Sequence, residues 1–231
     1  MADDEDDDLD QLIRRVDPDR WLTSRFIADK RARADVLALY AFDHELARAS
    51  RVASTQLLAE IRLTWWREAL DEIFAGGPIR RHPVAGALGE AVRRHDLPRE
   101  PLEAMIDGQI TALEAEFDAA ASLAWADAVE GSLATAAAFV LDPRCAERTV
   151  AAGRAWGLAL LWRSGRATET VLRPLLASAM AEARTAADGL SVAAMPAALP
   201  ARLARFDLEG RTPGLLSKQL SLIVASATGR L

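Results

Sequence analysis

Hydrophobic residues recur along most of this chain at intervals of three and four, which is the period of an α-helix. The most regular stripe surrounds the segment LALYAFDHELARASR, residues 37–51. Its members are Val36, Leu37, Leu39, Tyr40, Phe42, Leu46 and Ala47. Because one face of this segment is apolar, the pattern predicts a core helix from about residue 34 to residue 50, after a charged break over residues 29–33.

Proline, glycine and capping residues mark the ends of the other helices. A partner helix over residues 55–74 ends before the sequence Gly76-Gly77-Pro78. The remaining predicted helices cover residues 18–28, 83–92, 97–117, 123–141, 145–162, 168–188 and 213–227, with a turn at residues 195–200. No segment alternates with a period of two, so the sequence predicts an all-α fold of about eight to ten helices.

Two tryptophans, Trp65 and Trp66, stand side by side in the partner helix. Adjacent residues of a helix point about 100° apart, so at least one of the two indoles should lie in the core. We expect Trp65 to be buried, together with Leu39, Phe42 and Leu158.

Charge is distributed unevenly along the chain. Six of its 34 acidic residues fall in residues 3–8, so the remainder carries 28 acids against 28 lysines and arginines and is near neutral. Like charges without apolar neighbours do not compensate for the entropy of ordering, so residues 1–16 are expected to form an acidic, disordered tail. Residues 17–231 are then expected to form one helical domain, and nothing in the charge pattern indicates nucleic-acid binding.

The single cysteine, Cys145, excludes an intramolecular disulfide and is typical of a reducing compartment. The acidic N-terminus differs from a secretory signal, and the longest apolar stretch, residues 155–162, is too short to cross a bilayer. These features predict a cytoplasmic protein without a transmembrane segment. Peripheral contact with a membrane stays open, although no basic amphipathic helix demands it.

Three ordered blocks resemble the squalene and phytoene synthase family. They are RFIADKRARADVLALYAFDHELARA, RLTWWREALDEIFAGGPIRRHPVAGAL and LPREPLEAMIDGQ. The resemblance implies a single-domain isoprenoid-synthase-like helical bundle around a central cavity. In the family's enzymes, two aspartate-rich motifs on facing helices hold Mg²⁺ against a diphosphate.

The first of these motifs has lost its acids in this chain. Aligned on the YAF segment at residues 40–42, its acidic positions would fall at Ala47, Arg48 and Arg51. The nearby acids Asp43 and Glu45 project about 200° apart on a helix, so they cannot chelate one ion from one face.

The second motif has changed in the same way. The segment GRAWGLALLWRSGRAT, residues 153–168, is similar to the stretch in which an arginine precedes the second pair of acids. Arg163 matches that arginine, whereas Ser164 and Thr168 occupy the acidic positions. The resemblance therefore implies that a Mg²⁺ cage is missing on two sides, and we predict no catalytic residue, no metal ligand and no cofactor.

Basic residues replace the acids. His44, Arg48 and Arg51 share one helix face, and with Arg163 they form a candidate site for a phosphate or carboxylate held directly by guanidinium groups. Alternatively these residues are structural and pair with nearby acids. The acids within reach along the sequence are Glu45, Glu60 and Glu68.

The order YAF-x-x-ELA resembles a non-catalytic branch of the family that includes the mitochondrial complex I assembly factors. This resemblance predicts a protein-binding or assembly factor of the respiratory complex I type, with a protein as its partner. Two alternatives stay open: a prenyltransferase of isoprenoid biosynthesis with an altered, Mg²⁺-dependent site, and a carrier that binds an isoprenoid or another lipid without turnover. An open apolar cavity would favour the carrier.

Overall fold

The computed structural model describes residues 2–51, 53 and 55–231. Every regular element in these residues is a helix, which confirms the all-α prediction. In chain order the elements are α1 (Ala2–Val16), α2 (Pro18–Ser24), α3 (Lys30–Arg51), α4 (Gln56–Phe74), α5 (Pro83–His95), α6 (Arg99–Thr111), α7 (Ala119–Trp125), η1 (Ala126–Gly131), α8 (Ser132–Leu141), η2 (Pro143–Thr149), α9 (Val150–Ser164), α10 (Glu169–Ala187), α11 (Met195–Leu208) and α12 (Leu215–Thr228).

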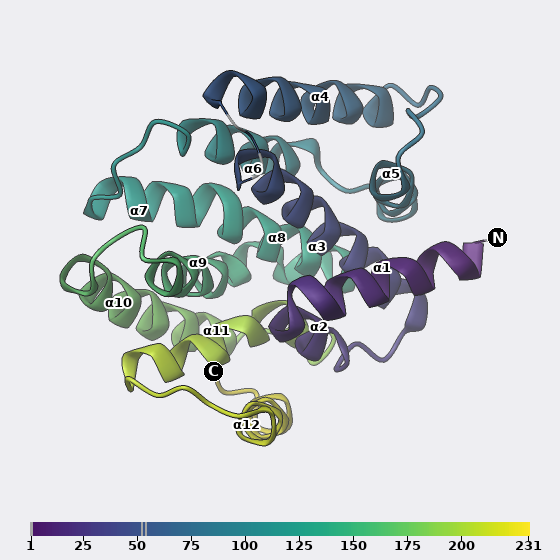
Figure 1. The fold of residues 1–231 in the computed structure, drawn as a ribbon. Helices are drawn as coiled ribbons and strands as arrows, with labels where there is room; N and C mark the ends of the chain where they lie inside the picture. The colour runs from purple at the N-terminus through teal and green to yellow at the C-terminus, as the bar shows by residue number, and fades with distance from the viewer. Residues whose placement is uncertain (1, 52, 54) are drawn as a thin grey trace.

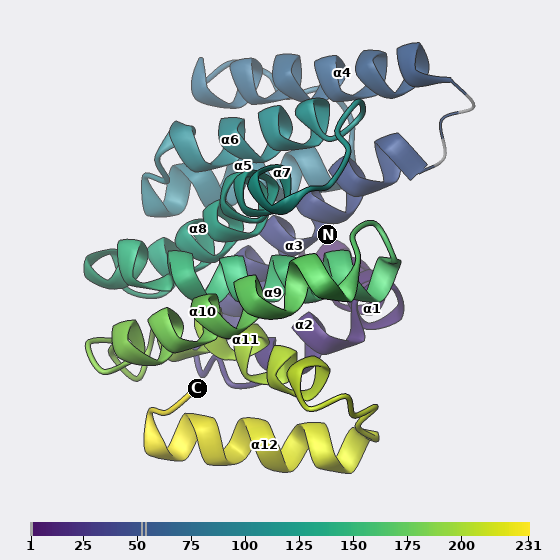
Figure 2. The same cartoon turned by 90° about the vertical axis from the view of Figure 1, so that its left-hand side faces the viewer.

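The helices stack in layers between α4 at one end of the molecule and α12 at the other (Figures 1 and 2). Helix α3 passes through the middle and packs on α1, α4, α5 and α8. Helix α9 occupies a similar place in the other half, where it packs on η1, α10 and α11. The C-terminal helix α12 packs mainly on α11.

Buried hydrophobic side chains form two clusters, one around α3 and one around α9. Leu39 and Phe42 lie in the first cluster and Leu158 lies in the second, as predicted. Trp65 is only half-buried, whereas its neighbour Trp66 is buried against Phe42. The expectation for Trp65 was wrong because the period alone does not show which of two adjacent indoles points at α3.

Residues 1–16 were expected to be an acidic, disordered tail, and the part of this segment that the structure describes, Ala2–Val16, is helix α1. Leu9 and Ile13 lie four residues apart in its second half and are buried in the α3 cluster. The carboxylate of Asp10 also accepts a hydrogen bond from the indole of Trp21, 3.0 Å away. The apolar residues of the second half of α1 provide the packing that the acidic run lacks.

Two helix boundaries also differ from the prediction. Helix α3 starts at Lys30 within the expected charged break, where the carboxylate of Asp29 accepts a hydrogen bond from the backbone of Ala32 at 2.8 Å. Residues 195–200 were expected to be a turn, but they open α11. Pro196 lies in the first turn of that helix, where a backbone N–H has no helical partner, so proline is tolerated there.

The alanine-rich segment from Ala119 to Leu141 is continuous but includes the π-helical turn η1. Its 23 residues are long and apolar enough to cross a membrane by composition, although 61% of the relevant window is buried inside the protein. The longest apolar stretch expected from the sequence was residues 155–162, and this longer segment was not considered. Since buried core helices satisfy the same criterion, the segment is weak support for a membrane span.

Candidate functional site

A cavity of about 350 Å³ lies between α3 and α9, with α2 and η1 also contributing to its walls. Five of its residues come from each of the two main helices, so the motif helices face each other as the resemblance implies. From α3 these are Tyr40, Asp43, His44, Ala47 and Arg51, and from α9 they are Trp156, Leu160, Leu161, Arg163 and Ser164.

A buried arginine on α2, Arg20, binds three carboxylates at this cavity. One guanidinium nitrogen is 2.8 Å from Asp43 and 3.1 Å from Asp17, and the other contacts Glu130. Burial lowers the pKa of Arg20, but the neighbouring carboxylates, with Glu130 first among them, raise it well above its usual value. Arg20 is therefore a permanent cation, and the three acids surround it at the cavity.

Glu130 is held in place by the unusual backbone of η1. Glu130 is buried within this π-helical turn, a form of helix that is rare and often found at functional sites, and its carboxyl group contacts Arg20. Gly153 of α9 makes the close approach possible, because a Cβ atom there would collide with the carbonyl oxygen of Glu130. Burial raises the pKa of Glu130 to about 8, since desolvation and the charge of Asp43 outweigh the attraction of Arg20.

The mouth of the cavity carries a second set of ion pairs. Asp19 lies 2.6 Å from the Nζ atom of Lys218 on α12 and 3.4 Å from Arg163. Arg163 also reaches Asp207 on α11, at 2.8 Å. The guanidinium predicted to receive a ligand is thus already bonded to two carboxylates.

The residues of the predicted anion site separate in the structure. His44, Arg51 and Arg163 line the cavity, but Arg48 points to a different cavity and pairs with Glu45 at 3.4 Å. The reason is geometric. Residues 48 and 51 are three apart and point about 60° away from each other on the helix, and only the side of α3 that carries Arg51 faces this cavity. For Arg48, the structure therefore favours the alternative of a structural ion pair.

The predicted motif positions separate in the same way. Ala47 and Ser164 line the cavity, whereas Thr168 lies just before α10 as its capping residue, outside the lining. Burial lowers the pKa of His44, so this imidazole supplies less positive charge to the cavity than an exposed histidine would.

The sequence did not indicate the Arg20 cluster. Asp17 directly precedes the predicted helix over residues 18–28, and Glu130 lies inside the predicted helix over residues 123–141, with nothing in the sequence pattern to connect them. A usable signal was present, since Glu130 is one of only two acids, with Asp127, in residues 119–141, and it is flanked by Val129 and Gly131. Such an acid is rarely buried unless a cation meets it.

The donor set of the cavity does not suit a Mg²⁺ cluster. Mg²⁺ needs several oxygen ligands in an octahedron, whereas the carboxylates at this cavity are bonded to Arg20, Arg163 and Lys218. Within the described part of the chain, no three His, Cys, Asp or Glu side chains are placed to hold a metal ion together.

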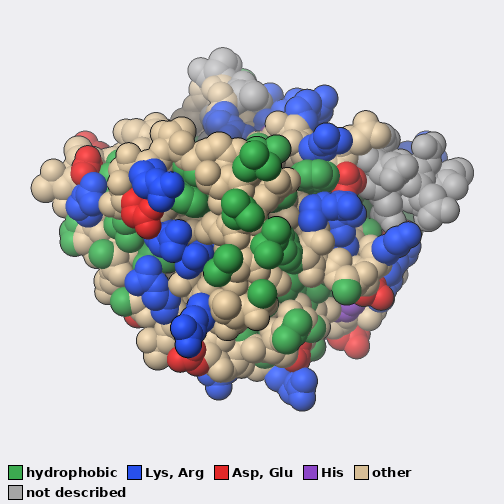
Figure 3. All heavy atoms as spheres, turned by 90° about the horizontal axis from the view of Figure 1, so that it is seen from below, with side chains coloured by type: hydrophobic (Ala, Val, Ile, Leu, Met, Phe, Trp, Pro, Cys, Tyr) green, Lys and Arg blue, Asp and Glu red, His purple; other side chains and the backbone are tan. Residues whose placement is uncertain are grey.

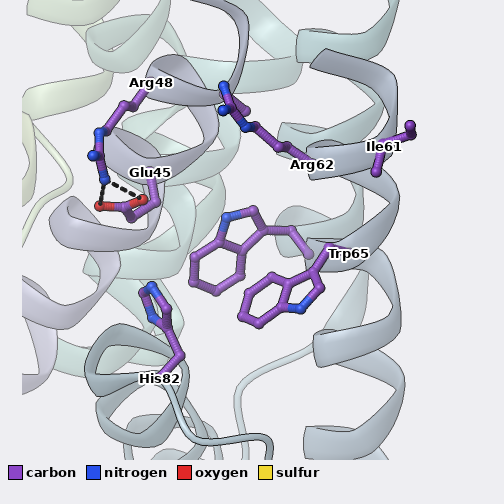
Figure 4. A pocket seen from close by; sticks show the side chains of 8 residues that line it. Glu45, Arg48, Ile61, Arg62, Trp65 and His82 are labelled. Carbon is purple, nitrogen blue, oxygen red and sulfur yellow. Dashed lines mark hydrogen bonds and ion pairs between the residues drawn. The ribbon is translucent and has the colours of Figure 1, made fainter. Parts of the chain in front are cut away.

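A second cavity of about 330 Å³ opens between the C-terminal part of α3 and α4 (Figure 4). Trp65 and Trp66 meet with ring centroids 4.9 Å apart, and His82 packs edge-on against both. Figure 4 shows Glu45 and Arg48 paired at its rim, on the side facing His82. The Nδ1 atom of His82 is buried and meets no hydrogen-bond partner among the described residues.

The raised pKa of Glu130 predicts a pH-dependent stability. The unfolded carboxyl titrates near 4.5 and the folded one near 8, so the native state holds an additional proton between these values. This contribution is complete below the unfolded pKa and is lost as the pH rises through the folded pKa. We therefore expect the free energy of unfolding to fall from about pH 5 to about pH 9, measured by urea titration followed by circular dichroism.

The matched variant for this measurement is Glu130→Gln, whose amide resembles the neutral acid and does not titrate. The decline between about pH 5 and about pH 8 should become shallower in the variant. An equally steep decline in both proteins would assign the effect to other groups.

A family model described as squalene/phytoene synthase matches residues 13–169, more than half of the chain. Two curated relatives are NADH dehydrogenase (ubiquinone) complex I, assembly factor 6, of Bos taurus and of Homo sapiens. They are 33% and 31% identical over 97 residues, which cover 42% of this chain. The match spans only 28% of the length of these relatives.

Solved structures match over almost the whole chain. A dehydrosqualene synthase in complex with ligand superposes with a TM-score of 0.79 at 15% identity, over 98% of this chain and 96% of that one. Squalene synthase HpnC from Alicyclobacillus acidocaldarius superposes with a TM-score of 0.67, also at 15% identity, over 97% and 94% of the two chains. These matches confirm the predicted isoprenoid-synthase-like fold.

Proposed function

This chain belongs to the squalene/phytoene synthase family, and from that premise we propose that it is a non-catalytic member that binds another protein, as an assembly factor of the respiratory complex I type. One observation carries the proposal. Between α3 and α9, where the family's enzymes are expected to hold Mg²⁺ and a diphosphate, acids and bases of the protein neutralise one another.

The physical reason lies in the leaving group. Ionisation of an allylic diphosphate develops about three negative charges, which metal ions must compensate in an apolar site. Arg20 is engaged with its own three carboxylates and Arg163 with two more, so neither guanidinium replaces the metals. The proposal accordingly includes no cofactor.

The lining of the same cavity disfavours both alternatives. Eight of its nineteen lining residues are charged, so a prenyl chain packed against the apolar ones, Trp125, Trp156 and Leu160 among them, would also remove water from ionic groups. That cost counts against a lipid carrier and against a prenyltransferase.

A surface suited to a protein partner lies at the α4 end. Leu57 and Ile61 are 64% and 55% exposed, and the cavity beside them is walled by Trp65 and His82. An apolar anchor residue of a partner fits such an aromatic pocket, with Arg48 as part of the polar rim. The 97-residue match to complex I assembly factor 6 supports a partner of that type. The cytoplasmic location expected from the sequence remains part of the proposal.

The enzymatic alternative can be tested directly. Purified protein incubated with Mg²⁺ and farnesyl or geranylgeranyl diphosphate should release no pyrophosphate above a control without protein, because the cavity has no place for the metal cluster. Release that disappears on addition of a chelator would overturn the proposal and restore the prenyltransferase.

Protein binding is tested by affinity purification of the tagged chain from its own cells, with a substituted chain as the comparison. Subunits or assembly intermediates of a respiratory complex should co-purify with the wild type and disappear with Ile61→Asp/Trp65→Ala, because both changes destroy the apolar pocket. Leu220→Ser, at the opposite end of the molecule, is the matched control and should retain them. Identical sets of proteins from wild type and the pocket variant would contradict this surface.

A further inference from the structure

The C-terminal helix α12 presents a hydrophobic face to the outside. The exposed fractions are 63% for Leu215, 75% for Leu216, 64% for Leu220, 53% for Ile223 and 50% for Val224. Its buried residues are Ser221, Leu222 and Ala225. Figure 3, a view of this end of the molecule, shows the hydrophobic side chains gathered in one patch with lysines and arginines on both sides.

The shape of this face limits what can cover it. Its five exposed side chains span about half of the helix circumference at about 100° per residue, so the surface is convex. Neither of the two large cavities takes a lining residue from α12 among the described residues. A partner protein therefore finds no pocket for an anchor residue on α12, whereas a soft apolar layer can surround a convex helix.

The length of α12 determines whether it could cross a lipid bilayer or only lie on its surface. Fourteen residues give a helix of about 21 Å, shorter than the roughly 30 Å hydrocarbon core of a bilayer. The helix is also fixed along its inner side, because Arg202 of α11 donates a hydrogen bond to the hydroxyl of Ser221 at 2.9 Å. It can thus lie in the plane of a membrane surface but not cross it.

Basic side chains border the apolar face. Arg184 donates a hydrogen bond to the carbonyl oxygen of Leu231 at 3.4 Å, which places it at the end of α12, and Arg230 is exposed beside it. At the other end Arg211 is exposed and shares Glu209 with Arg205. From residue 202 to residue 231 the chain has five basic residues against two acidic ones.

The two acids of this segment do not neutralise the border. Asp207 is bonded to Arg163 at the cavity, and Glu209 is shared between two arginines. Lys218 is likewise bonded to Asp19 at the cavity, so the remaining excess of positive charge comes from the arginines at the border of the apolar face. This excess is complementary to the anionic headgroups of a phospholipid surface.

We propose that the outward face of α12 is a membrane-docking surface, in which its five apolar side chains enter the headgroup region of an anionic bilayer and the bordering arginines contact lipid phosphates. Figures 1 and 2 place α12 at the opposite end from α4. Docking through α12 leaves the α4 pocket accessible, so membrane binding and protein binding can occur together. This inference does not depend on the proposed protein partner.

Co-sedimentation with lipid vesicles tests it on the whole chain. The protein should bind vesicles of phosphatidylglycerol and phosphatidylcholine more tightly than vesicles of phosphatidylcholine alone, and added salt should weaken that binding. Leu216→Asn/Leu220→Asn/Ile223→Asn should weaken binding by more than ~10-fold, since each buried leucine or isoleucine is worth about that factor. Arg211→Gln/Arg230→Gln should reduce both the affinity and its dependence on salt.

The matched control is Leu57→Asn/Ile61→Asn, which removes exposed apolar residues from α4 instead and should bind vesicles like the wild type. Thermal unfolding checks that the variants fold, and Leu216→Asn alone replaces the triple variant if that one does not. Equal vesicle binding by wild type and the α12 variants would overturn the inference. The inference would also be overturned if light scattering showed that the wild type is a dimer and the α12 variants are monomers. A second copy of the chain would then cover the face.

Discussion

Replacement of Arg20 with methionine should lower the free energy of unfolding by about 3–5 kcal/mol, the usual cost of leaving buried charge uncompensated. Arg20 is 4% exposed, and it contacts the nearly buried carboxylates of Asp43 and Glu130. Methionine matches much of the side-chain volume but supplies no hydrogen bond and no charge. The buried carboxyl groups of Asp43 and Glu130 would then lose their hydrogen-bond donor, which destabilises the native state.

Urea unfolding followed by circular dichroism at neutral pH measures this loss. Arg67→Met is the matched control, because Arg67 is 42% exposed, pairs at the surface with Asp107, which is 57% exposed, and should cost under ~1 kcal/mol. Adding Asp43→Asn to Arg20→Met should recover part of the stability, since a neutral amide at this position no longer needs the cation. A loss in Arg20→Met no larger than in the control would show that the cluster does not stabilise the fold.

Truncation of Phe42 to alanine should cost about 3–5 kcal/mol, the range for a large side chain removed from a close-packed core. Phe42 is fully buried on α3, and its ring meets that of Trp66 edge-on with centroids 5.3 Å apart. The substitution removes this aromatic contact and leaves a cavity that the surrounding helices cannot fully close.

The same urea titration measures this change against Leu57→Ala, which removes an apolar side chain that is 64% exposed. The control should stay within about 0.5 kcal/mol of the wild type. A cost for Phe42→Ala under ~1 kcal/mol would place this residue at the edge of the core rather than in it.

The two exposed apolar surfaces suggest how such a protein could work. The α4 pocket and the α12 face lie at opposite ends of one stack of helices (Figures 1 and 2). Between them, the cavity between α3 and α9 holds internal ion pairs across the interior. In our proposals, the fold serves as a rigid spacer between a membrane surface and a protein partner.

The sequence by itself determined the all-α class and the positions of most helices. Local properties were sufficient for this, because a period of 3.6 residues, a proline or a glycine acts within a few residues of the chain. The alignment that places Ala47, Arg48, Arg51, Ser164 and Thr168 at positions expected to be acidic is also a local comparison. It uses the segment around residues 40–42 and the segment 153–168, and it stays a prediction.

Only the tertiary structure decided which polar residues meet. Arg20 and Glu130 are 110 residues apart in the chain, and nothing local couples them. Arg48 and Arg51 share one helix face in the sequence, yet only Arg51 lines the cavity between α3 and α9. Ion pairs of this kind depend on where separate helices cross, and that is set by the packing of both hydrophobic clusters together.

The tertiary structure also decided what each apolar stripe covers. The periodic residues Leu9 and Ile13 of α1 reach the core, whereas the equally periodic residues Leu216, Leu220 and Ile223 of α12 remain outside. A hydrophobic period shows that a helix has an apolar face, but not whether another element lies against it. Burial is a property of two surfaces in contact, and the sequence of one helix describes only one of them.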